Sequence, residues 1–297
     1  MKLVVALSSM LLAALATGCA LGSARTTPAH HAWTPGAWTP VRGDWWRDAA
    51  WHDGQAEECV YEATRTIYGV ERRYVATAYT NKERVDPKTT CKTEDPAGIE
   101  VFKHHWSEVV PTERYDYRFS TMGYLVAETG APFKLTVSTQ EDCGASFKEC
   151  WKTGERFRWS DSVYFPGAGR REGEVAHERR FQFADTLALA LRYLRAEDLA
   201  QEFVVPVVPA QKDTHQVGWE LSKRRVRGIG RSTQELPIGR IEAEGLEVLD
   251  ETGAVLERFW FAADETAPLL RAMVRYEGPG GVTYRLKSHE RTAYWKR

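Results

Sequence analysis

The sequence has almost no excess of charge of either sign. Its 297 residues carry 40 Lys and Arg against 41 Asp and Glu. Removal of residues 1–18 would delete only Lys2 among the charged groups, which leaves 39 against 41, a net charge of −2. A body this close to neutral gives no electrostatic reason to expect nucleic acid or an anionic membrane surface as a partner.

Motifs of familiar chemistry are also missing. The chain has no phosphate loop, no His-Glu-x-x-His, no Cys-x-x-Cys pair and no Gly-x-Ser-x-Gly elbow. The glycine-rich segment 167–173 lacks the G-x-G-x-x-G spacing, and no apolar helix follows it, so we interpret it as a surface hairpin turn. The motif search therefore predicts neither a cofactor nor a metal ion.

An uncharged apolar run is found at the N-terminus. Lys2 precedes an apolar stretch that reaches Ala16, and Thr17 and Gly18 then lead directly to Cys19. This order is typical of a bacterial lipoprotein signal. We expect cleavage before Cys19 and acylation of its thiol, which would anchor the protein by lipid in the cell envelope. Ala20 in place of an aspartate favours the outer membrane, with the body in the periplasm.

Two alternatives remain for this segment. An ordinary secretory signal would be cut near Ala16 or Ala20 and would leave a soluble protein. A retained helix over residues 3–24 would have to supply the roughly 20 predominantly apolar residues that a bilayer span needs, and polar or small residues dilute its second half. The cysteine directly after Thr-Gly favours the lipoprotein signal.

Residues 19–43 are predicted to be a tether, because proline and glycine recur there without apolar periodicity. A flexible chain of this length has an r.m.s. reach of about 25–30 Å. Trp33 and Trp38 lie in a repeated Ala-Trp-Thr-Pro unit, and they would either lie at the membrane interface or dock on the body.

Four cysteines remain after Cys19, and an even number in an oxidising compartment is compatible with two disulfides. Cys143 and Cys150 are close enough in sequence to join a hairpin or loop, which would leave Cys59 to pair with Cys91. Three connectivities are possible. Buried free thiols, which pack as small apolar groups, are the alternative.

Period-two patterning dominates the chain from residue 44. Segments 133–137, 156–160 and 282–287 alternate apolar with polar residues, as strands with one packed face do. Further strand candidates are 57–67, 70–80, 114–126, 176–183, 215–226, 238–249, 255–262 and 269–277. Turn residues separate them. We predict a mainly β fold of antiparallel meanders that form curved sheets or open half-barrels.

One short helix is expected near 186–196. Asp185 is a suitable N-cap, and leucines follow at 187, 191 and 194, a spacing that puts them on one face. The Pro-containing segment after it, 204–209, reads as an edge strand or extended connection. The chain then divides into a signal (1–18), a tether (19–43), a first β-region (44–183), a helix connector (184–202) and a second β-region (203–297).

Three clusters carry candidate chemistry. His104 and His105 are adjacent, and on a strand they would point to opposite faces, so we expect no shared metal ion; His30 and His31 lie in the tether and are weaker still. Two acidic residues precede Cys143 and disfavour its thiolate, so a structural cysteine is expected. Segment 172–178 contains three Glu and His177. Alternation places Glu172 and Glu174 on one face and His177 on the other, so we expect a solvated, charge-paired face rather than a catalytic or metal site.

Several blocks of the sequence resemble an uncharacterised group of bacterial lipoproteins of about this length. The longest is 134–144, Lys-Leu-Thr-Val-Ser-Thr-Gln-Glu-Asp-Cys-Gly. The others are Trp51 to Arg72, Tyr115 to Met122, Arg258 to Ala262 and Arg291 to Trp295. The resemblance covers most of the mature chain and implies no established activity.

Members of that group often carry the label "septum formation inhibitor Maf". True Maf proteins are cytoplasmic nucleotide pyrophosphatases with an N-terminal Ser-x-Ser-Pro-Arg-Arg motif, which this chain lacks. The label therefore transfers no catalytic residue. The second β-region is also similar to periplasmic domains with an open, Lol-carrier-like half-barrel, in which a curved antiparallel sheet wraps a helix or an apolar ligand.

Together these observations favour a non-enzymatic function. We expect a lipid-anchored envelope protein whose β-sheet body binds an apolar ligand or a protein partner. A cavity of several hundred Å³ would support ligand binding. The alternative is an envelope hydrolase with an unfamiliar site, which predicts a cleft where a carboxylate, a histidine or Cys143 has a strongly perturbed pKa.

Overall fold

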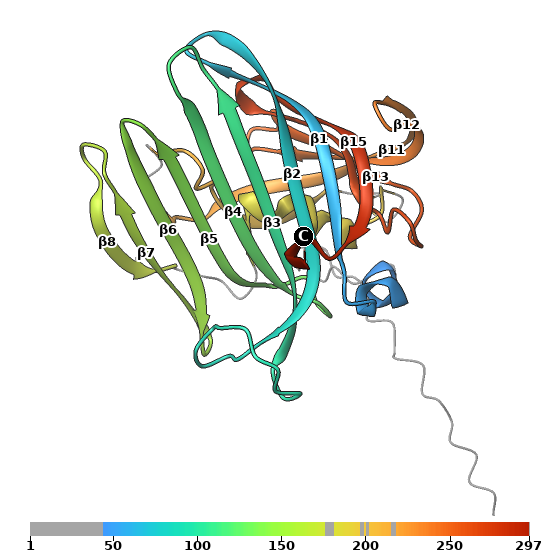
Figure 1. Cartoon of the computed structure of the whole chain (residues 1–297), viewed down its shortest axis with the longest axis horizontal. Coiled ribbons are helices and arrows are strands. Elements are labelled where there is room, and N and C mark those ends of the chain that lie inside the picture. The colour runs from blue at the N-terminus through green and yellow to red at the C-terminus, as the bar shows by residue number, and fades with distance from the viewer. Residues whose placement is uncertain (1–43, 176–180, 197–198, 200–201, 215–217, 297) are drawn as a thin grey trace, which may run out of the picture. The chain divides into compact units, whose positions relative to one another are not determined.

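A single fifteen-stranded β-sheet makes up most of the structure (Figure 1). The computed structural model describes residues 44–175, 181–196, 199, 202–214 and 218–296. The strand order is β8-β7-β6-β5-β4-β3-β2-β1-β15-β14-β13-β12-β11-β10-β9. All neighbours are antiparallel except β9 and β10. The sheet is curved and unclosed, which confirms the predicted mainly β class.

Strands β1 to β8 form one half of the sheet and β9 to β15 form the other. The first half consists of β1 (Ala56–Ile67), β2 (Val70–Val85), β3 (Ile99–Pro111), β4 (Asp116–Val126), β5 (Pro132–Glu141), β6 (Gly144–Thr153), β7 (Arg156–Val163) and β8 (Gly169–Glu174). The second half consists of β9 (Gln182–Phe183), β10 (Phe203–Val208), β11 (Ser222–Leu236), β12 (Gly239–Leu249), β13 (Val255–Ala262), β14 (Met273–Gly278) and β15 (Val282–Thr292).

The described helices are short. They are η1 (Trp45–Arg47), η2 (Ala49–His52), η3 (Ala184–Thr186), α1 (Leu187–Ala190), η4 (Leu191–Tyr193), η6 (Pro279–Gly281) and η7 (Tyr294–Lys296). No helix among the described residues is both long and apolar enough to cross a membrane.

Pairing of β1 with β15 joins the two sequence regions into one sheet. The register runs from Ala56 opposite Thr292 to Thr64 opposite Thr283, with a bulge between Val60 and Tyr61. This contact links residues more than 200 positions apart, and local patterning carries no information about it.

Alternating burial explains why these segments fold as strands. In β5, Leu135, Val137 and Thr139 are buried, and the residues between them are half-buried. Successive strand residues point to opposite faces, so one face packs inward and the other meets water. The predicted strand at 133–137 is confirmed. Of the glycine-rich segment 167–173, which was expected to be a hairpin turn, only residues 167 and 168 lie in the turn of the β7–β8 hairpin, and the rest belong to β8.

The β9–β10 edge packs against β5, β6 and β7. Phe183 and Val208 share a buried cluster with Leu135, Cys150 and Phe157. The segment after β10 contributes to the same contact: the indole of Trp219 donates a hydrogen bond to Asp161 Oδ1 at 3.0 Å. The sheet thus curls over itself although its two edges are not hydrogen-bonded to each other.

The helical segment η3–α1–η4 lies between the two halves of the sheet (Figure 1). At its start, Thr186 approaches Gly123 of β4 so closely that a Cβ on Gly123 would lie 2.3 Å from Thr186 Cγ2. At its end, the hydroxyl of Tyr193 donates to the carbonyl of Ala127 at 2.7 Å. Contacts from the sheet therefore fix both ends of this segment.

The predicted helix at 186–196 is shorter than expected. Only residues 187–190 are α-helical, with 3₁₀ turns on both sides. Asp185 does not cap the helix; its Oδ2 accepts a hydrogen bond from the backbone of Gln211 at 2.7 Å. The expected N-cap is thus engaged by another segment.

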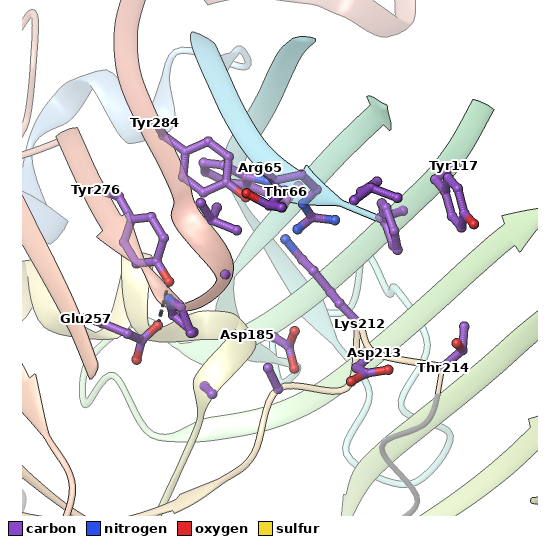
Figure 2. A pocket seen from close by; sticks show the side chains of 18 of the residues that line it. Arg65, Thr66, Tyr117, Asp185, Lys212, Asp213, Thr214, Glu257, Tyr276 and Tyr284 are labelled. Atoms are coloured by element: carbon purple, nitrogen blue, oxygen red, sulfur yellow. Dashed lines mark hydrogen bonds between the residues drawn. The ribbon is translucent and has the colours of Figure 1, made fainter. Parts of the chain in front are cut away.

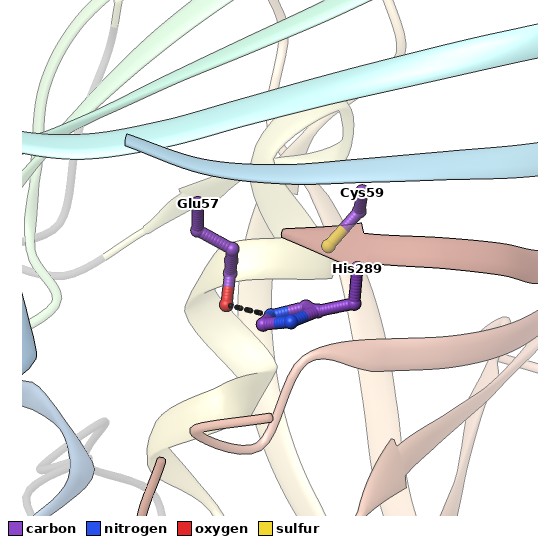
Figure 3. Close-up of side chains that lie close together, drawn as sticks. All are labelled: Glu57, Cys59 and His289. Atoms are coloured by element: carbon purple, nitrogen blue, oxygen red, sulfur yellow. Dashed lines mark hydrogen bonds and ion pairs between the residues drawn. The ribbon is translucent and has the colours of Figure 1, made fainter. Parts of the chain in front are cut away.

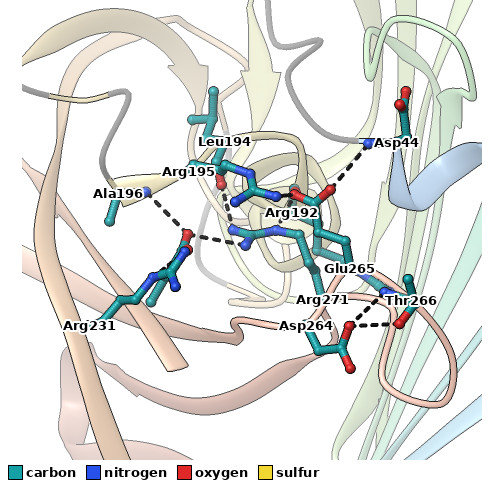
Figure 4. Close-up of polar contacts among 11 residues, drawn as sticks. Asp44, Arg192, Leu194, Arg195, Ala196, Arg231, Asp264, Glu265, Thr266 and Arg271 are labelled. Carbon is teal, nitrogen blue, oxygen red and sulfur yellow. Dashed lines mark hydrogen bonds and ion pairs between the residues drawn. The ribbon is translucent and has the colours of Figure 1, made fainter. Parts of the chain in front are cut away.

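Arg271 binds the C-terminal end of the helical segment (Figure 4). Its buried guanidinium donates to the carbonyls of Arg192 at 3.1 Å and Leu194 at 2.7 Å. It also forms an ion pair with Glu244 of β12 at 3.1 Å. Carbonyls that a helix leaves unpaired at its end are satisfied here by an arginine.

Aromatic residues from η1 and η2 cover one end of the interior. Trp45 stacks on Phe102 of β3 with ring centroids 4.9 Å apart, and it meets Tyr193 at 5.1 Å. The indole of Trp51 donates to the carbonyl of Trp45 at 2.8 Å. The described chain therefore begins with a packed cap, at the end of the sheet where β1 starts.

Several sequence predictions fall outside the described residues. These are the signal and tether with Cys19, the histidines at 30 and 31, and residues 176–180 and 215–217 of two strand candidates. Within the described part, β9 covers only the last two residues of the 176–183 candidate, and β11 begins at Ser222.

Candidate ligand cavity

A cavity of about 910 Å³ opens between the two halves of the sheet (Figure 2). Its walls come from the ends of β1, β3 and β4 on one side and from β13, β14 and β15 on the other. The helical segment contributes Ala184, Asp185 and Ala188, and the chain after β10 contributes residues 210 and 212–214. Turns at one end of the sheet form its rim, opposite the end that Trp45 covers.

Aromatic side chains form much of the wall. Tyr276 of β14 stacks on Tyr284 of β15 at 5.3 Å, and Trp106 of β3 meets Tyr284 edge-on at 4.7 Å. Phe259 of β13 lies 4.9 Å from Tyr276. Phenol and indole groups give such a wall a large apolar surface with a few polar tips.

A buried carboxylate lies under the wall. Glu108 Oε1 accepts hydrogen bonds from the hydroxyls of Tyr74 at 2.7 Å and Tyr284 at 2.6 Å, and Oε2 accepts from Lys212 Nζ at 2.8 Å. Arg65 stands 3.9 Å away. Burial alone would raise the pKa of Glu108, but Lys212 and Arg65 stabilise its anion and lower the pKa to about 2.

Two other carboxyl groups point into the cavity with raised pKa values. The hydroxyl of Tyr276 donates to Glu257 Oε1 at 2.8 Å, and burial raises the pKa of Glu257 to about 7 (Figure 2). Burial also raises the pKa of Asp185, whose Oδ1 has no hydrogen-bond partner among the described residues. Both groups therefore spend more time uncharged than ordinary carboxyls do.

Tyrosines and a thiol surround the rim. Tyr68 and Gly69 both have positive φ, as the two-residue turn between β1 and β2 requires, and this places Tyr68 at the mouth. Its hydroxyl lies 2.5 Å from that of Tyr117, and Tyr115 connects Tyr117 to Cys143 Sγ at 3.2 Å. The rim thus presents rings with polar tips to solvent.

Comparisons with known proteins place the chain in no family. No family model and no curated protein match it. Among solved structures, it is similar to the crystal structure of a beta-barrel-like protein of domain of unknown function DUF1849 from Brucella abortus. The TM-score is 0.49 and the identity 8%, over 80% of this chain and 98% of that chain. We draw nothing about function from that likeness.

Of the candidate residues that the sequence indicated, Cys143 lies at the rim of the cavity, whereas the two adjacent histidines do not line it. The candidate histidines His104 and His105 do point to opposite faces, as expected: His104 is buried and its Nδ1 meets Thr80 at 2.9 Å, whereas His105 Nε2 meets Ser120 at 3.0 Å. Burial lowers the pKa of His104 to about 3, so it stays neutral. Neither lines the cavity.

The four cysteines of the body are free thiols, contrary to the expected disulfides. Cys143 lies in the β5–β6 turn, whereas Cys150 is buried far along β6, opposite Leu135. Six residues of strand span about 20 Å, and a disulfide needs Cα atoms within about 7 Å. Cys59 lies opposite Ala78 of β2, and Cys91 lies beyond the end of that strand, so the same argument separates them.

A second cluster has the ligand types of a metal site. Ligand atoms of Glu57, Cys59 and His289 lie within 4.8 Å of one another (Figure 3). However, Arg192 donates to both carboxylate oxygens of Glu57, at 2.8 and 3.1 Å. Burial, and then the neighbouring Glu57, raise the pKa of the Cys59 thiol well above its usual range. A guanidinium beside a protonated thiol disfavours a cation, so the cluster fits a buried ion-pair network better.

The charged face predicted in segment 172–178 agrees with β8. Glu172 and Glu174 are exposed, and Glu174 pairs with Arg156 at 3.1 Å. His177 and Glu178 lie outside the described residues.

Sequence reasoning missed the charged groups of the cavity, although a signal exists. Arg65 continues the inward series of Tyr61 and Ala63 in β1, and Glu108 continues that of Trp106 in β3. Glu257 likewise precedes the buried Phe259 by two positions. A charged residue on the apolar face of a strand marks a polar interior site, because burial of a charge requires partners.

Proposed function

We propose that this protein is a lipid-anchored cell-envelope protein that binds an apolar or amphipathic ligand in the cavity between the two halves of its sheet. The observation that carries the proposal is the cavity itself. At about 910 Å³ it lies at the upper end of the roughly 300–1,000 Å³ range of small-molecule sites. A sheet packed solid by its own side chains would have left no such space.

The lining supports an amphipathic rather than a wholly apolar ligand. Aromatic and aliphatic groups from six strands supply apolar surface, and a small number of polar groups converge from β1, β13 and the segment after β10. Sites for small molecules commonly combine an apolar wall with a few placed polar groups that fix orientation.

The N-terminal signal supports the location. Acylation of Cys19 would attach the body to a membrane, in our proposal the outer membrane on its periplasmic side. A protein held beside a bilayer by its own lipid encounters amphipathic molecules at high local concentration, which agrees with a cavity of this character.

A hydrolase remains the second candidate, and Glu257 is the observation that favours it. A carboxyl with a pKa near 7 in a cleft is a recognised mark of acid–base chemistry. Glu257 accepts a hydrogen bond from the hydroxyl of Tyr276, and no serine, threonine or cysteine among the described residues is hydrogen-bonded to it. Ligand binding explains the cavity without requiring a nucleophile beside Glu257.

Fluorescence titration with an environment-sensitive apolar dye tests the proposal. The wild-type protein, freed of lipid, should bind the dye saturably, and an Ala188→Trp variant should lose that binding because the indole fills the cavity. Ala97 is exposed in the connection between β2 and β3, at the end of the sheet opposite the rim, so Ala97→Trp is the matched control and should bind as the wild type does. Saturable binding that survives Ala188→Trp would place the ligand elsewhere and contradict the proposal.

A further inference from the structure

Arg65 holds hydrogen-bond donors that no described residue uses. Its side chain is 16% exposed and lines the cavity. Glu108, its ion-pair partner, stands 3.9 Å away, beyond hydrogen-bond distance. The guanidinium also lies 4.7 Å over the ring of Phe119, which fixes its plane without occupying its N–H groups.

Glu108 does not need these donors. Tyr74, Tyr284 and Lys212 already supply hydrogen bonds to both of its oxygens. Both cations of the cavity therefore contact one carboxylate, that of Glu108. Figure 2 shows the Lys212 ammonium beside Arg65, where both face the cavity.

We infer that Arg65, with Lys212 beside it, binds the anionic head of an amphipathic ligand, a carboxylate or a phosphate, whose apolar part fills the aromatic cavity. This inference rests on the ligand-binding function proposed above and names the class of ligand. A guanidinium with free N–H groups matches the paired oxygens of carboxylate and phosphate in geometry and in charge.

The other acidic groups of the cavity are compatible with an anion. Burial raises the pKa of Glu257 to about 7, so this carboxyl is partly protonated at neutral pH, and burial raises the pKa of Asp185 as well. Glu141 belongs to the rim at the end of β5, and Asp213 lies in the segment after β10, where its carbonyl accepts a hydrogen bond from Lys148 at 2.8 Å. Among the described residues, Arg65 and Lys212 are the cations that line the cavity.

A panel of ligands with one chain length and different heads tests the inference. Dodecanoate, dodecyl phosphate, dodecanol and dodecylamine are each titrated below their micelle concentrations against the bound dye. Wild-type protein should bind the two anions about 10- to 100-fold more tightly than the alcohol, the range that charge-assisted hydrogen bonds give. The amine should bind most weakly. Acetate and inorganic phosphate, without an apolar chain, should not displace the dye at the same concentrations.

Substitutions at Arg65 separate recognition from folding. Arg65→Gln should remove most of the preference for dodecanoate over dodecanol, because only Lys212 remains to bind the head, and should leave the affinity for dodecanol unchanged. Arg65→Lys should keep a larger part of the preference. Arg73 of β2 is 84% exposed, so Arg73→Gln is the matched control and should behave as the wild type.

Different results would overturn different parts of the account. Equal affinity for alcohol and acid in the wild type, or a preference that persists undiminished in Arg65→Gln, would overturn the role of Arg65. Displacement by acetate or inorganic phosphate alone would overturn the need for an apolar chain. Absence of saturable binding by the dye and by every dodecyl compound would instead contradict the proposed function itself.

Discussion

Arg192 is the residue whose loss should damage the fold most clearly. It is 2% exposed, it donates two hydrogen bonds to Glu57 of β1, and its guanidinium lies 4.3 Å over the ring of Trp45. Arg192→Met would keep most of the apolar stem and remove the charge. Glu57 would then remain buried with only the imidazole of His289, 3.1 Å away.

Two estimates of the cost agree. Breaking a buried ion pair by removing one partner costs about 3–5 kcal/mol. Independently, burial would raise the pKa of Glu57, yet Arg192 and His289 bring it from an ordinary 4.5 to about 2. A difference of that size corresponds to roughly 3 kcal/mol of stability at neutral pH. The midpoint of urea unfolding should therefore fall by about 1 M or more, given typical denaturant slopes.

The pH dependence of the protein's stability tests the Arg192–Glu57 ion pair in a second way. A carboxyl whose folded pKa is lowered stabilises the protein above its unfolded value, and that contribution is lost as the pH falls through the folded value. The difference in stability between wild type and Arg192→Met should be full above pH 4.5 and should shrink as the pH falls towards 2.

Two controls complete the experiment. Arg73→Met changes an exposed arginine and should shift the midpoint little. Glu57→Leu combined with Arg192→Met removes both charges and should recover much of the loss, because an apolar pair of similar volume avoids the unpaired buried charge. A midpoint for Arg192→Met that matches Arg73→Met would refute the reasoning.

The structure gives three further predictions, and the N-terminal sequence gives a fourth. Burial raises the folded pKa of Glu257 above its ordinary 4.5, so the stability tied to its protonated form is present below pH 4.5 and lost as the pH rises through 7. The melting temperature of Glu257→Gln should therefore rise relative to that of the wild type between pH 4.5 and 7. Parallel curves of melting temperature against pH would contradict this. Gly123→Ala should cost about 1–3 kcal/mol in urea unfolding because its Cβ meets Thr186 Cγ2, and adding Thr186→Ser should restore part of the loss; no change would show that the contact yields freely. A thiol reagent should label only Cys91 and Cys143 in the folded protein, because these two thiols are exposed, and should label all four cysteines of the body after unfolding. Protection of all four in the folded protein would indicate disulfides. Cys19→Ser should move the protein from the membrane fraction to the soluble fraction, and persistent membrane attachment would be evidence against lipidation.

The strands were predictable because each carries its own signal. In β5 and β15 the apolar residues alternate with polar ones, because one face of each strand is buried and the other is not. A single strand therefore contains the whole pattern. The long pairing of β1 with β15 and the packing of β9 against β5 are decided by residues far apart in sequence. Local periodicity does not contain that information.

The expected helix and disulfides show the same limit. Aspartate is a residue type that favours the N-cap position, but the carboxylate of Asp185 accepts a hydrogen bond from the backbone N–H of Gln211 instead. The α-helix has only four residues, fewer than predicted. The seven-residue spacing of Cys143 and Cys150 suggested a joined loop, whereas the intervening residues form an extended strand that holds the thiols apart. In both cases a tertiary partner decides against the local pattern.

The candidate site was the least predictable part. Arg65, Glu108 and Glu257 belong to no motif, and each comes from a different strand. Their common feature is a charge at an inward position of an alternating strand, which becomes informative only when the strand and its buried face are known. The N-terminal signal, by contrast, is a local pattern, and its outcome at Cys19 stays a prediction.

Calorimetric titration of the lipid-free protein with dodecanoate would show whether the cavity between the two halves of the sheet binds an apolar chain. We expect one binding site per chain, with the negative heat-capacity change that accompanies burial of apolar surface. We also expect Ala188→Trp to abolish the binding heat and Ala97→Trp to preserve it. No saturable heat in the wild type, or an unchanged isotherm in Ala188→Trp, would contradict a ligand cavity between the two halves of the sheet.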